Sequence, residues 1–272
     1  MFNFFKTILS VIFSLVSLVS CGSEKNKNSD EIAFDFLWED KTDLYLPMTA
    51  EWTNRVEAAD LNDDGLVDLI FANGGNYSDP GKLESSRVFL NQGPDVQFLE
   101  VTDQIFGTNK FYARVIKSQD LNNDGITDFF IGNTFHTQSE LYFGTGDGKF
   151  NRVTDTHLPK MLASIGDVEF GDVDDDGDLD IILSDWGPGS NMDNAGGQTM
   201  LWINDGAGEF QNVTQTQMPA ILIQFSWDLE FIDFDNDFDL DIAISCKRCG
   251  GSRLFENDGK GSFVERPIIP AY

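Results

Sequence analysis

Short hydrophobic runs alternate with acidic and glycine-rich stretches along most of the chain. Four runs are short, rich in β-branched or aromatic residues and end in turn formers, as is typical of strands: VDLIFAN, TDFFIGN, LDIILSD and LDIAISC. Each follows an acidic stretch, which is itself preceded by another β-rich run: RVEAAD, VIKSQD, DVEFGD or DLEFID. No helical periodicity of useful length lies between them. We therefore predict four pairs of strands, each pair joined by an acidic loop.

Two further runs follow each pair. The third begins after a variable connection and reads RVFLNQG, ELYFGTG, TMLWIND or SRLFEND, and a glycine-rich turn leads to a fourth, QFLEVT, KFNRVT, EFQNVT or SFVERP. Glycine in these turns supplies the positive φ of hairpins. Four short antiparallel strands at a steady period predict an all-β fold, a β-propeller of four-stranded blades. The repeats span about 49–103, 104–155, 156–216 and 217–267.

The acidic loops have the spacing of a calcium site. In DVDDDGDLD (172–180), carboxylates occupy positions 1, 3 and 5, glycine follows at position 6 and aspartate at position 9. Alternate positions let three carboxylates converge, and calcium prefers six to eight oxygen ligands, whereas magnesium keeps its waters. We therefore predict up to four bound Ca²⁺. The candidate side-chain ligands are Asp60, Asn62, Asp64 and Asp68; Asp120, Asn122, Asp124 and Asp128; Asp172, Asp174, Asp176 and Asp180; and Asp233, Asp235, Asp237 and Asp241.

These loops are not EF-hands. An EF-hand loop has twelve residues, ends in a bidentate Glu and lies between helices. Position 12 is apolar in all four repeats, and the flanking runs are strand-like. The fourth loop departs from the others because Phe238 stands where they have glycine. A bulky residue in a turn that needs positive φ is strained, so we expect the fourth site to be the weakest.

The repeat resembles the FG-GAP/VCBS family, the calcium-loop blades of integrin α-subunit heads and of many bacterial envelope proteins. The resemblance covers about residues 33–272 and rests on four loops of the form D-x-[DN]-x-D-(G)-x-x-D with a following strand like F-x-x-V-T. It implies a backbone carbonyl ligand at position 7, from Leu66, Ile126, Asp178 and Asp239. Integrin-like propellers have seven blades. We therefore expect either a closed four-bladed propeller or a piece of a larger one, and favour the piece.

The N-terminus predicts export and lipidation. The run TILSVIFSLVSLVS is too short to span a bilayer, which takes about twenty residues, but suits a signal-peptide core. It ends in Leu18-Val19-Ser20-Cys21, which resembles a bacterial lipobox, although an ordinary signal peptide with an incidental cysteine is the alternative. We predict a signal peptide at 1–21 with lipidation at Cys21, a flexible tether at 22–32 and the propeller at 33–272. The protein would then be membrane-anchored in the bacterial envelope, periplasmic or surface-exposed.

The two remaining cysteines, Cys246 and Cys249, lie in CKRCGG. A zinc site would need a second pair of ligands, and the sequence holds just two histidines, His136 and His157. A thioredoxin-like motif belongs at a helix N-terminus in an α/β pattern, which this chain lacks. A short local disulfide is therefore the preferred interpretation outside the cytosol.

Charge and motifs narrow the function. A net charge of −28, with 46 acidic against 18 basic residues, excludes nucleic acid as a partner, because phosphate binding needs a basic face. No GxSxG, Walker or HExxH motif is present. Abundant carboxylates leave a polysaccharide lyase or glycoside hydrolase open, and a structural part of an envelope assembly is a third class. We favour a calcium-stabilised module that binds an extracellular or periplasmic glycan or protein.

Blade topology predicts where a ligand would bind. Loops of an up-and-down blade alternate between two faces, so the calcium loops share one face with the turns between third and fourth strands. The other face carries the long, aromatic-bearing connections, and binding residues concentrate on loops held by a rigid scaffold. The alternative is that these aromatics pack on neighbouring blades. The candidates on this face are Tyr77, Phe111, Tyr112, Trp186, Phe225, Trp227, Lys247 and Arg248.

Overall fold

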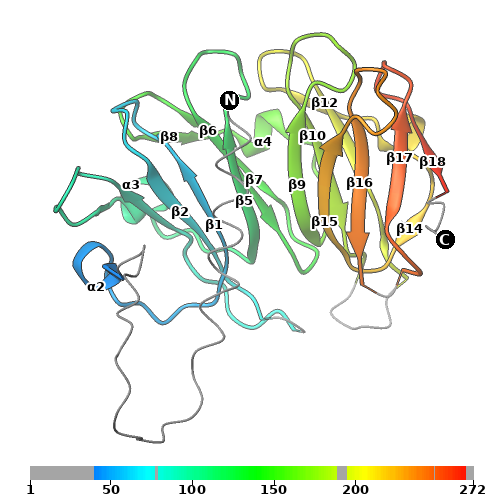
Figure 1. Ribbon diagram of the computed structural model, residues 1–272. Coiled ribbons are helices and arrows are strands. Elements are labelled where there is room, and N and C mark those ends of the chain that lie inside the picture. The colour runs from blue at the N-terminus through cyan, green and yellow to red at the C-terminus, as the bar shows by residue number, and fades with distance from the viewer. Residues whose placement is uncertain (1–39, 77–78, 189–194, 248, 268–272) are drawn as a thin grey trace, which may run out of the picture. The chain divides into compact units, whose positions relative to one another are not determined.

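The computed structural model describes residues 40–76, 79–188, 195–247 and 249–267, and its main elements are four antiparallel sheets of four strands each (Figure 1). The predicted all-β class with four-stranded sheets is confirmed. Sheet 1 comprises β1 (Thr53–Ala59), β2 (Asp68–Asn73), β3 (Arg87–Leu90) and β4 (Leu99–Glu100); sheet 2 comprises β5 (Ala113–Gln119), β6 (Asp128–Asn133), β7 (Glu140–Gly144) and β8 (Phe150–Arg152); sheet 3 comprises β9 (Ile165–Gly171), β10 (Asp180–Asp185), β12 (Met200–Asn204) and β13 (Phe210–Asn212); and sheet 4 comprises β15 (Ser226–Ile232), β16 (Asp241–Cys246), β17 (Arg253–Asn257) and β18 (Phe263–Arg266).

Each sheet is a meander whose first strand lies at one edge and whose fourth strand lies at the other. The first strands of successive sheets, β1, β5, β9 and β15, lie next to one another. A small additional sheet pairs β11 (Gly197–Gln198) with β14 (Leu222–Ile223). None of the described sheets closes into a barrel, and the arrangement is compatible with a β-propeller-like fold.

In the described part of the chain, four short helices interrupt the strand pattern, and the hydrophobic pattern did not predict them. They are α2 (Thr42–Tyr45), α3 (Thr102–Phe106), α4 (Thr154–His157) and α5 (Thr214–Gln217). The last three follow the fourth strand of sheets 1, 2 and 3. A single turn is too short for a 3.6-residue periodicity to show. None of the helices in the described part of the chain is long and apolar enough to cross a membrane.

The recurrent Val-Thr pair after the fourth strand has a structural cause. The threonine of each pair is buried, and its hydroxyl accepts a hydrogen bond from a backbone N–H of the third strand. In sheet 2, Thr154 Oγ1 lies 2.9 Å from the N of Leu141. Thr102 and Thr214 do the same for Val88 and Leu201. A buried N–H left unpaired costs free energy, so this threonine ends the fourth strand without that loss.

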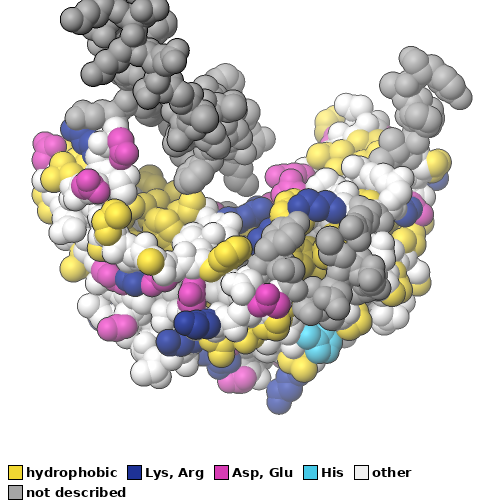
Figure 2. Space-filling model, turned by 90° about the horizontal axis from the view of Figure 1, so that it is seen from below, with side chains coloured by type: hydrophobic (Ala, Val, Ile, Leu, Met, Phe, Trp, Pro, Cys, Tyr) yellow, Lys and Arg dark blue, Asp and Glu magenta, His cyan; other side chains and the backbone are white. Residues whose placement is uncertain are grey.

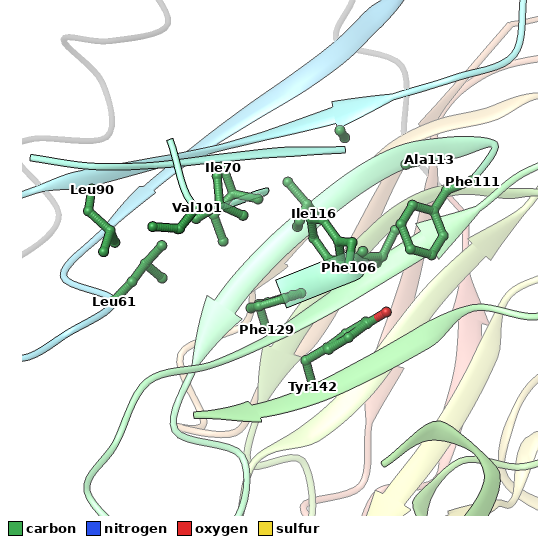
Figure 3. Close-up of a cluster of buried hydrophobic side chains, with 13 residues drawn as sticks. Leu61, Ile70, Leu90, Val101, Phe106, Phe111, Ala113, Ile116, Phe129 and Tyr142 are labelled. Atoms are coloured by element: carbon green, nitrogen blue, oxygen red, sulfur yellow. The ribbon is translucent and has the colours of Figure 1, made fainter. Parts of the chain in front are cut away.

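Three hydrophobic clusters separate the four sheets, and each cluster takes side chains from two neighbouring sheets. Figure 3 shows the first cluster, between sheets 1 and 2. There Phe106 packs edge-on against Phe111, with ring centroids 5.3 Å apart, and against Tyr142 at 5.5 Å. Tyr142 in turn stacks on Phe129 at 4.8 Å. The single turn α3 thus brings Phe106 into the core, although no helical pattern in the sequence predicts this turn.

The connections divide between the two ends of the sheets, as blade topology predicts. The acidic loops join first and second strands at the top in Figure 1, together with the turns between third and fourth strands. The connections between second and third strands, and those from one sheet to the next, lie at the opposite end. We call these the acidic-loop end and the opposite end.

Candidate functional site

The first aspartate of each acidic loop organises the turn. In the third loop, Asp172 accepts hydrogen bonds from the N–H groups of Asp176 and Gly177 at 3.1 and 3.0 Å. The same two bonds occur at the first aspartate of the first and second loops. Each therefore curls around its own first carboxylate, which positive φ at the glycine permits (+95° at Gly177).

The carboxylates at positions 1, 3 and 5 converge, as their spacing predicts. Oxygen atoms of Asp172, Asp174 and Asp176 all lie within 4.8 Å of one another, and those of Asp233, Asp235 and Asp237 do so in the fourth loop. Oδ1 of Asp174 is buried and has no hydrogen-bond partner. A buried carboxylate oxygen without a partner is costly, and a cation would satisfy it. This oxygen and the all-oxygen donor set fit a hard cation such as calcium.

Asparagine replaces one carboxylate in the first two loops. Asn62 and Asn122 stand at position 3, and each donates its amide N–H to the position-5 aspartate, Asp64 or Asp124, at 3.1 Å. The amide oxygen remains an acceptor on the same side chain and receives the N–H of that aspartate. These loops thus carry less negative charge than the third and fourth.

The position-9 aspartates are buried, although the sequence placed them among candidate ligands. Asp68, Asp128, Asp180 and Asp241 are each 0% exposed. Both oxygens of Asp180 accept backbone N–H groups, from Val173 at 3.1 Å and from Asn204 at 2.9 Å, and the other three make the equivalent bonds. Each therefore ties its loop to the third strand. Burial raises the pKa of Asp128 and Asp180 to about 7, against the N–H bonds that lower it.

The fourth loop keeps the backbone turn but loses part of its hydrogen bonding. Phe238 has φ +77°, close to the +82° of Gly65, and its ring is 93% exposed. Asp233 accepts from the N–H of Asn236 at 2.7 Å. Among the described residues, neither Asp237 nor Phe238 donates to Asp233 as the equivalent residues do in the other loops. The strained residue therefore accompanies a looser first-aspartate turn.

Replacing Phe238 with glycine should stabilise the protein. Left-handed backbone costs a side-chain-bearing residue roughly 1–2 kcal/mol, which exceeds the extra unfolded-state entropy of glycine, roughly 0.5–1 kcal/mol. We expect Phe238→Gly to raise the melting temperature by about 2–4 °C, since about 1 kcal/mol shifts Tm by that much in a chain of this size. Phe238→Ala removes the same exposed ring but keeps the strain, and should leave Tm within a degree or so. Equal effects of the two variants would show that the ring, not the backbone, matters.

Neighbouring acidic loops are joined by side chains that sequence reasoning treated as turn formers. Asn257, at the end of β17, donates to the carbonyl of Val173 in the preceding loop at 2.8 Å. Asn204 makes the equivalent bond to Leu121 at 2.8 Å. Asn123 of the second loop also donates to the Asp178 carboxylate of the third at 2.6 Å. The sequence signal for Asn204 and Asn257 is the asparagine that recurs at the end of the third strand, before the glycine-rich turn.

An aromatic and cationic cluster lies at the opposite end. The rings of Trp186 and Trp227 stack with centroids 5.5 Å apart and an interplanar angle of 12°. Arg114 Cζ lies 5.0 Å from the Trp186 centroid and 4.7 Å from that of Trp227, and Lys247 Nζ lies 3.5 Å from the latter. Figure 2 views this end and shows Lys or Arg and hydrophobic side chains side by side toward its middle. Cations over indole faces attract the ring quadrupole.

The structure places the candidates for the ligand face in different environments. Trp186, Trp227 and Lys247 come together, with Trp186 buried at 7% exposure and Lys247 exposed. Phe111 is a core residue at 4% exposure and is not on the face, because Phe106 of α3 draws it inward. Tyr112 is half-buried against Phe135.

The remaining predicted residues fall in two groups. Tyr77, Arg248 and Cys21 lie outside the described residues. Phe225 packs near Trp186, with centroids 6.1 Å apart. A disulfide joins Cys246 and Cys249 on either side of the segment that carries Lys247. This bond closes a short loop next to the cluster.

Arg114 is the residue that sequence reasoning missed in this cluster. It lies in β5, one residue before the run VIKSQD that the sequence assigned to a strand, and its only signal is a basic residue in an acidic chain. Its guanidinium also donates to Asn54 Oδ1 at 3.1 Å, and Trp52 Nε1 donates to the same oxygen at 3.1 Å. Trp52 is 46% exposed, so the cluster continues to solvent.

An ion pair between a buried aspartate and a partly exposed arginine lies beside the cluster. Asp167 of β9 is 1% exposed at its side chain and accepts from Arg55 of β1 at 2.6 Å and from the N–H of Leu229 at 3.1 Å. Burial raises the pKa of Asp167, Arg55 lowers it, and the neighbouring Asp228 carboxylate raises it further, with a net rise. The bond joins the first strands of sheets 1 and 3.

The raised pKa of Asp167 predicts that this carboxyl lowers the stability of the fold as pH rises. The folded pKa lies above the unfolded value of about 3.9, so the unfolded state releases its proton first as pH rises. Stability attributable to this carboxyl is present below that value and is lost as pH rises through the folded pKa. We therefore expect the Tm of Asp167→Asn relative to wild type to increase steadily from pH 4.5 to 8. The exposed Asp103→Asn should show no such trend, and a flat difference for Asp167→Asn would contradict the assignment.

Comparison with known protein families identifies the repeat. A model described as an FG-GAP-like repeat matches residues 120–183 and 190–244. The chain therefore contains FG-GAP-like repeats, and the resemblance seen in the sequence is confirmed at that level. No curated protein matches the chain.

Several solved structures resemble this chain, including the following two. One is an Agrocybe aegerita lectin described as specifically recognising non-reducing terminal N-acetylglucosamine, with 19% identity, a TM-score of 0.45 and coverage of 76% of this chain and 49% of that one. The other is the V. cholerae biofilm matrix protein Bap1, with 16% identity, a TM-score of 0.40 and coverage of 78% and 39%. The chain thus spans about half, or less, of the length of these proteins.

Proposed function

We propose that this protein is a calcium-stabilised binding module of the cell envelope, built on a β-propeller scaffold. Its ligand is a glycan or protein, bound at the end opposite the acidic loops. The observation that carries this proposal is the division of chemistry between the two ends. One end carries the converging carboxylates, and the other holds cations over stacked tryptophans in a chain of net charge −28. FG-GAP-like repeats fit a binding or adhesion module.

Calcium would be held by the loop oxygens at positions 1, 3 and 5. The unpartnered buried Oδ1 of Asp174 and the closeness of the carboxylates support this. A cation binding the native state stabilises it by mass action. The hydrogen bonds from Asn204 and Asn257 to neighbouring loops would then pass that stabilisation from sheet to sheet.

The scaffold would be a propeller because its first strands converge. The strands β1, β5, β9 and β15 lie next to one another, and the Arg55–Asp167 pair joins two that are not sequence neighbours. First strands that meet around a common axis define the centre of propeller blades. The opposite end of that axis is where the aromatic and cationic cluster lies.

Binding tests the function directly. We expect the calcium-loaded, lipid-free protein to bind members of a panel of glycans and envelope proteins without converting them, and Trp227→Ala to abolish binding. The variant should keep the rise in melting temperature that calcium causes in wild type, because Trp227 lies away from the acidic loops. Turnover of a polysaccharide would instead favour the lyase or hydrolase alternative. If changing the exposed loop residue Asp63 abolished binding and Trp227→Ala kept it, the ligand would lie at the acidic-loop end, and the proposed location would be wrong.

Membrane attachment through Cys21 is part of the same proposal. The lipobox-like Leu18-Val19-Ser20-Cys21 and the short apolar run before it motivate it. We expect Cys21→Ala to move the full-length protein from the membrane to the soluble fraction, and mass spectrometry to find acylated Cys21 in wild type alone. Wild-type protein that is soluble and unacylated would contradict it.

A further inference from the structure

The first strand of each four-stranded sheet contains an irregularity at the same place. Pairing with the second strand shifts between Thr53 and Arg55 in β1, between Ala113 and Val115 in β5, around Gly166 in β9, and between Ser226 and Asp228 in β15. The extra residue lies six positions before its acidic loop in all four repeats. β-Bulges re-aim a side chain and are over-represented next to functional sites. The four bulged residues are Asn54, Arg114, Gly166 and Trp227.

These four positions converge on one place. Arg114 donates to Asn54 Oδ1 at 3.1 Å and lies 4.7 Å from the Trp227 centroid. A Cβ on Gly166 would lie 2.2 Å from Trp186 Nε1, so the absent side chain leaves room for this indole. Trp186 Nε1 also donates to the carbonyl of Ser226 at 2.8 Å. Each sheet thus contributes one group: an amide, a guanidinium and two indoles.

The chemistry of these positions differs from that of the core. Equivalent core positions repeat their type, as in Ile70, Phe130 and Ile182, because each must fill the same space between sheets. Equivalent bulge positions instead carry four different residues. Two of the four have a structural role: the Asn54 amide donates to the carbonyls of Gly74 at 2.9 Å and Ala113 at 2.8 Å, and Gly166 makes room for Trp186. Arg114 and Trp227 place a cation and an indole side by side, which suits a single asymmetric ligand.

We propose that the bulged residues Arg114 and Trp227, together with Lys247, build a site for a carboxylate-bearing sugar, such as a uronic or sialic acid residue of a glycan. This deepens, and rests on, the binding function proposed above. Arg114 presents a guanidinium and Lys247 an ammonium, both within 5 Å of the centroid of the same ring. Guanidinium matches a carboxylate through paired N–H bonds, and an ammonium adds a point charge. The half-exposed Trp52 offers a flat apolar surface to the sugar ring.

The disulfide and the buried indole support this geometry. Cys246 and Cys249 close the loop that carries Lys247, which limits the freedom of its backbone. Trp186 is 7% exposed and stacks on Trp227, so it serves as a floor and not as a contact surface. A preorganised site loses less entropy when it binds. The site would therefore recognise its ligand by charge and shape at the opposite end, away from the acidic loops.

The test pairs each acidic glycan with its neutral form. Calcium-loaded wild-type protein is titrated with a hyaluronan hexasaccharide, an oligogalacturonate and a sialyl-oligosaccharide, each beside the same glycan after carboxyl reduction. We expect at least one acid to bind, with its reduced form weaker by roughly tenfold or more, since a charge-assisted bond is lost. Arg114→Gln with Lys247→Gln should reduce affinity for the acid by a similar factor and flatten its salt dependence. Lys149→Gln, which removes a cation paired with Asp147 elsewhere, should change neither.

The outcomes separate the two proposals. Equal binding of acidic and reduced glycans, lost in Trp227→Ala, overturns the carboxylate assignment and leaves the binding function standing. Preference for a sulfated glycan that lacks carboxylate, or for an acidic peptide, also overturns it. Wild-type protein that binds neither these glycans nor any other member of the panel overturns both. Each variant is first shown to keep the wild-type rise in melting temperature on adding calcium, so that loss of binding reports on the site and not on folding.

Discussion

Chelating calcium should lower the melting temperature by roughly 10–30 °C. Extracellular-grade loops bind with Kd of about 10⁻⁴–10⁻³ M, so 10 mM calcium would stabilise each occupied site by about 1.4–2.7 kcal/mol. Three such sites, at about 2–4 °C per kcal/mol, give this range. The expected agent is the converged set of carboxylates, of which Oδ1 of Asp174 is buried and unpartnered. Thermal melts in EDTA and in 10 mM calcium measure it.

Matched variants locate the effect in the loops. Asp176→Ala should remove about a third of the calcium-dependent gain, because it disables one of three strong sites. Asp237→Ala, the same change in the fourth loop, should remove much less, since Phe238 has already loosened that turn. A melting temperature that ignores calcium, or an Asp237→Ala effect as large as that of Asp176→Ala, would contradict the ranking.

Asp180→Ala should destabilise the protein severely, even in EDTA. Its carboxylate is 0% exposed and accepts the N–H groups of Val173 and Asn204. Removing it leaves two buried donors unsatisfied, each costing about 1–3 kcal/mol, with a small cavity in addition. We expect a loss of roughly 3–6 kcal/mol in the free energy of unfolding, measured by urea denaturation in EDTA.

The control for this variant is the exposed Asp103→Ala, which should stay within about 0.5 kcal/mol of wild type. Measurement without metal separates the structural bonds of Asp180 from any part in calcium binding. If Asp180→Ala matched wild type in EDTA and differed only with calcium present, the position-9 aspartate would be a ligand alone and not a structural clamp.

The four-stranded sheets were predictable because each of their strands borders a distinctive signal. The acidic loops and glycine hairpins punctuate runs that could only be strands, and the loop spacing of 172–180 brought its carboxylates together as expected. The single-turn helices were not predictable, since one turn carries no periodicity. Phe111 was placed on the ligand face because it lies in a connection. In fact α3 turns Phe106 inward, and Phe111 follows it into the core.

The site at the opposite end was predicted in part. Trp186, Trp227 and Lys247 drew notice as aromatics and cations in loops, but Arg114 lies between the connection and the run VIKSQD and was not singled out. Its role depends on a bulge, which shifts register without leaving a sequence signature of its own. Gly166 was likewise not singled out, although its missing side chain makes room for Trp186.

An anomalous difference map tests the central claim most directly. Crystals grown with calcium and measured at long wavelength should show peaks within the loops at 60–68, 120–128 and 172–180, with a weaker peak or none at 233–241. Such peaks should disappear from crystals grown in EDTA, if those form at all. Loops free of anomalous density at millimolar calcium, or peaks confined to the end that carries Trp227, would contradict the account.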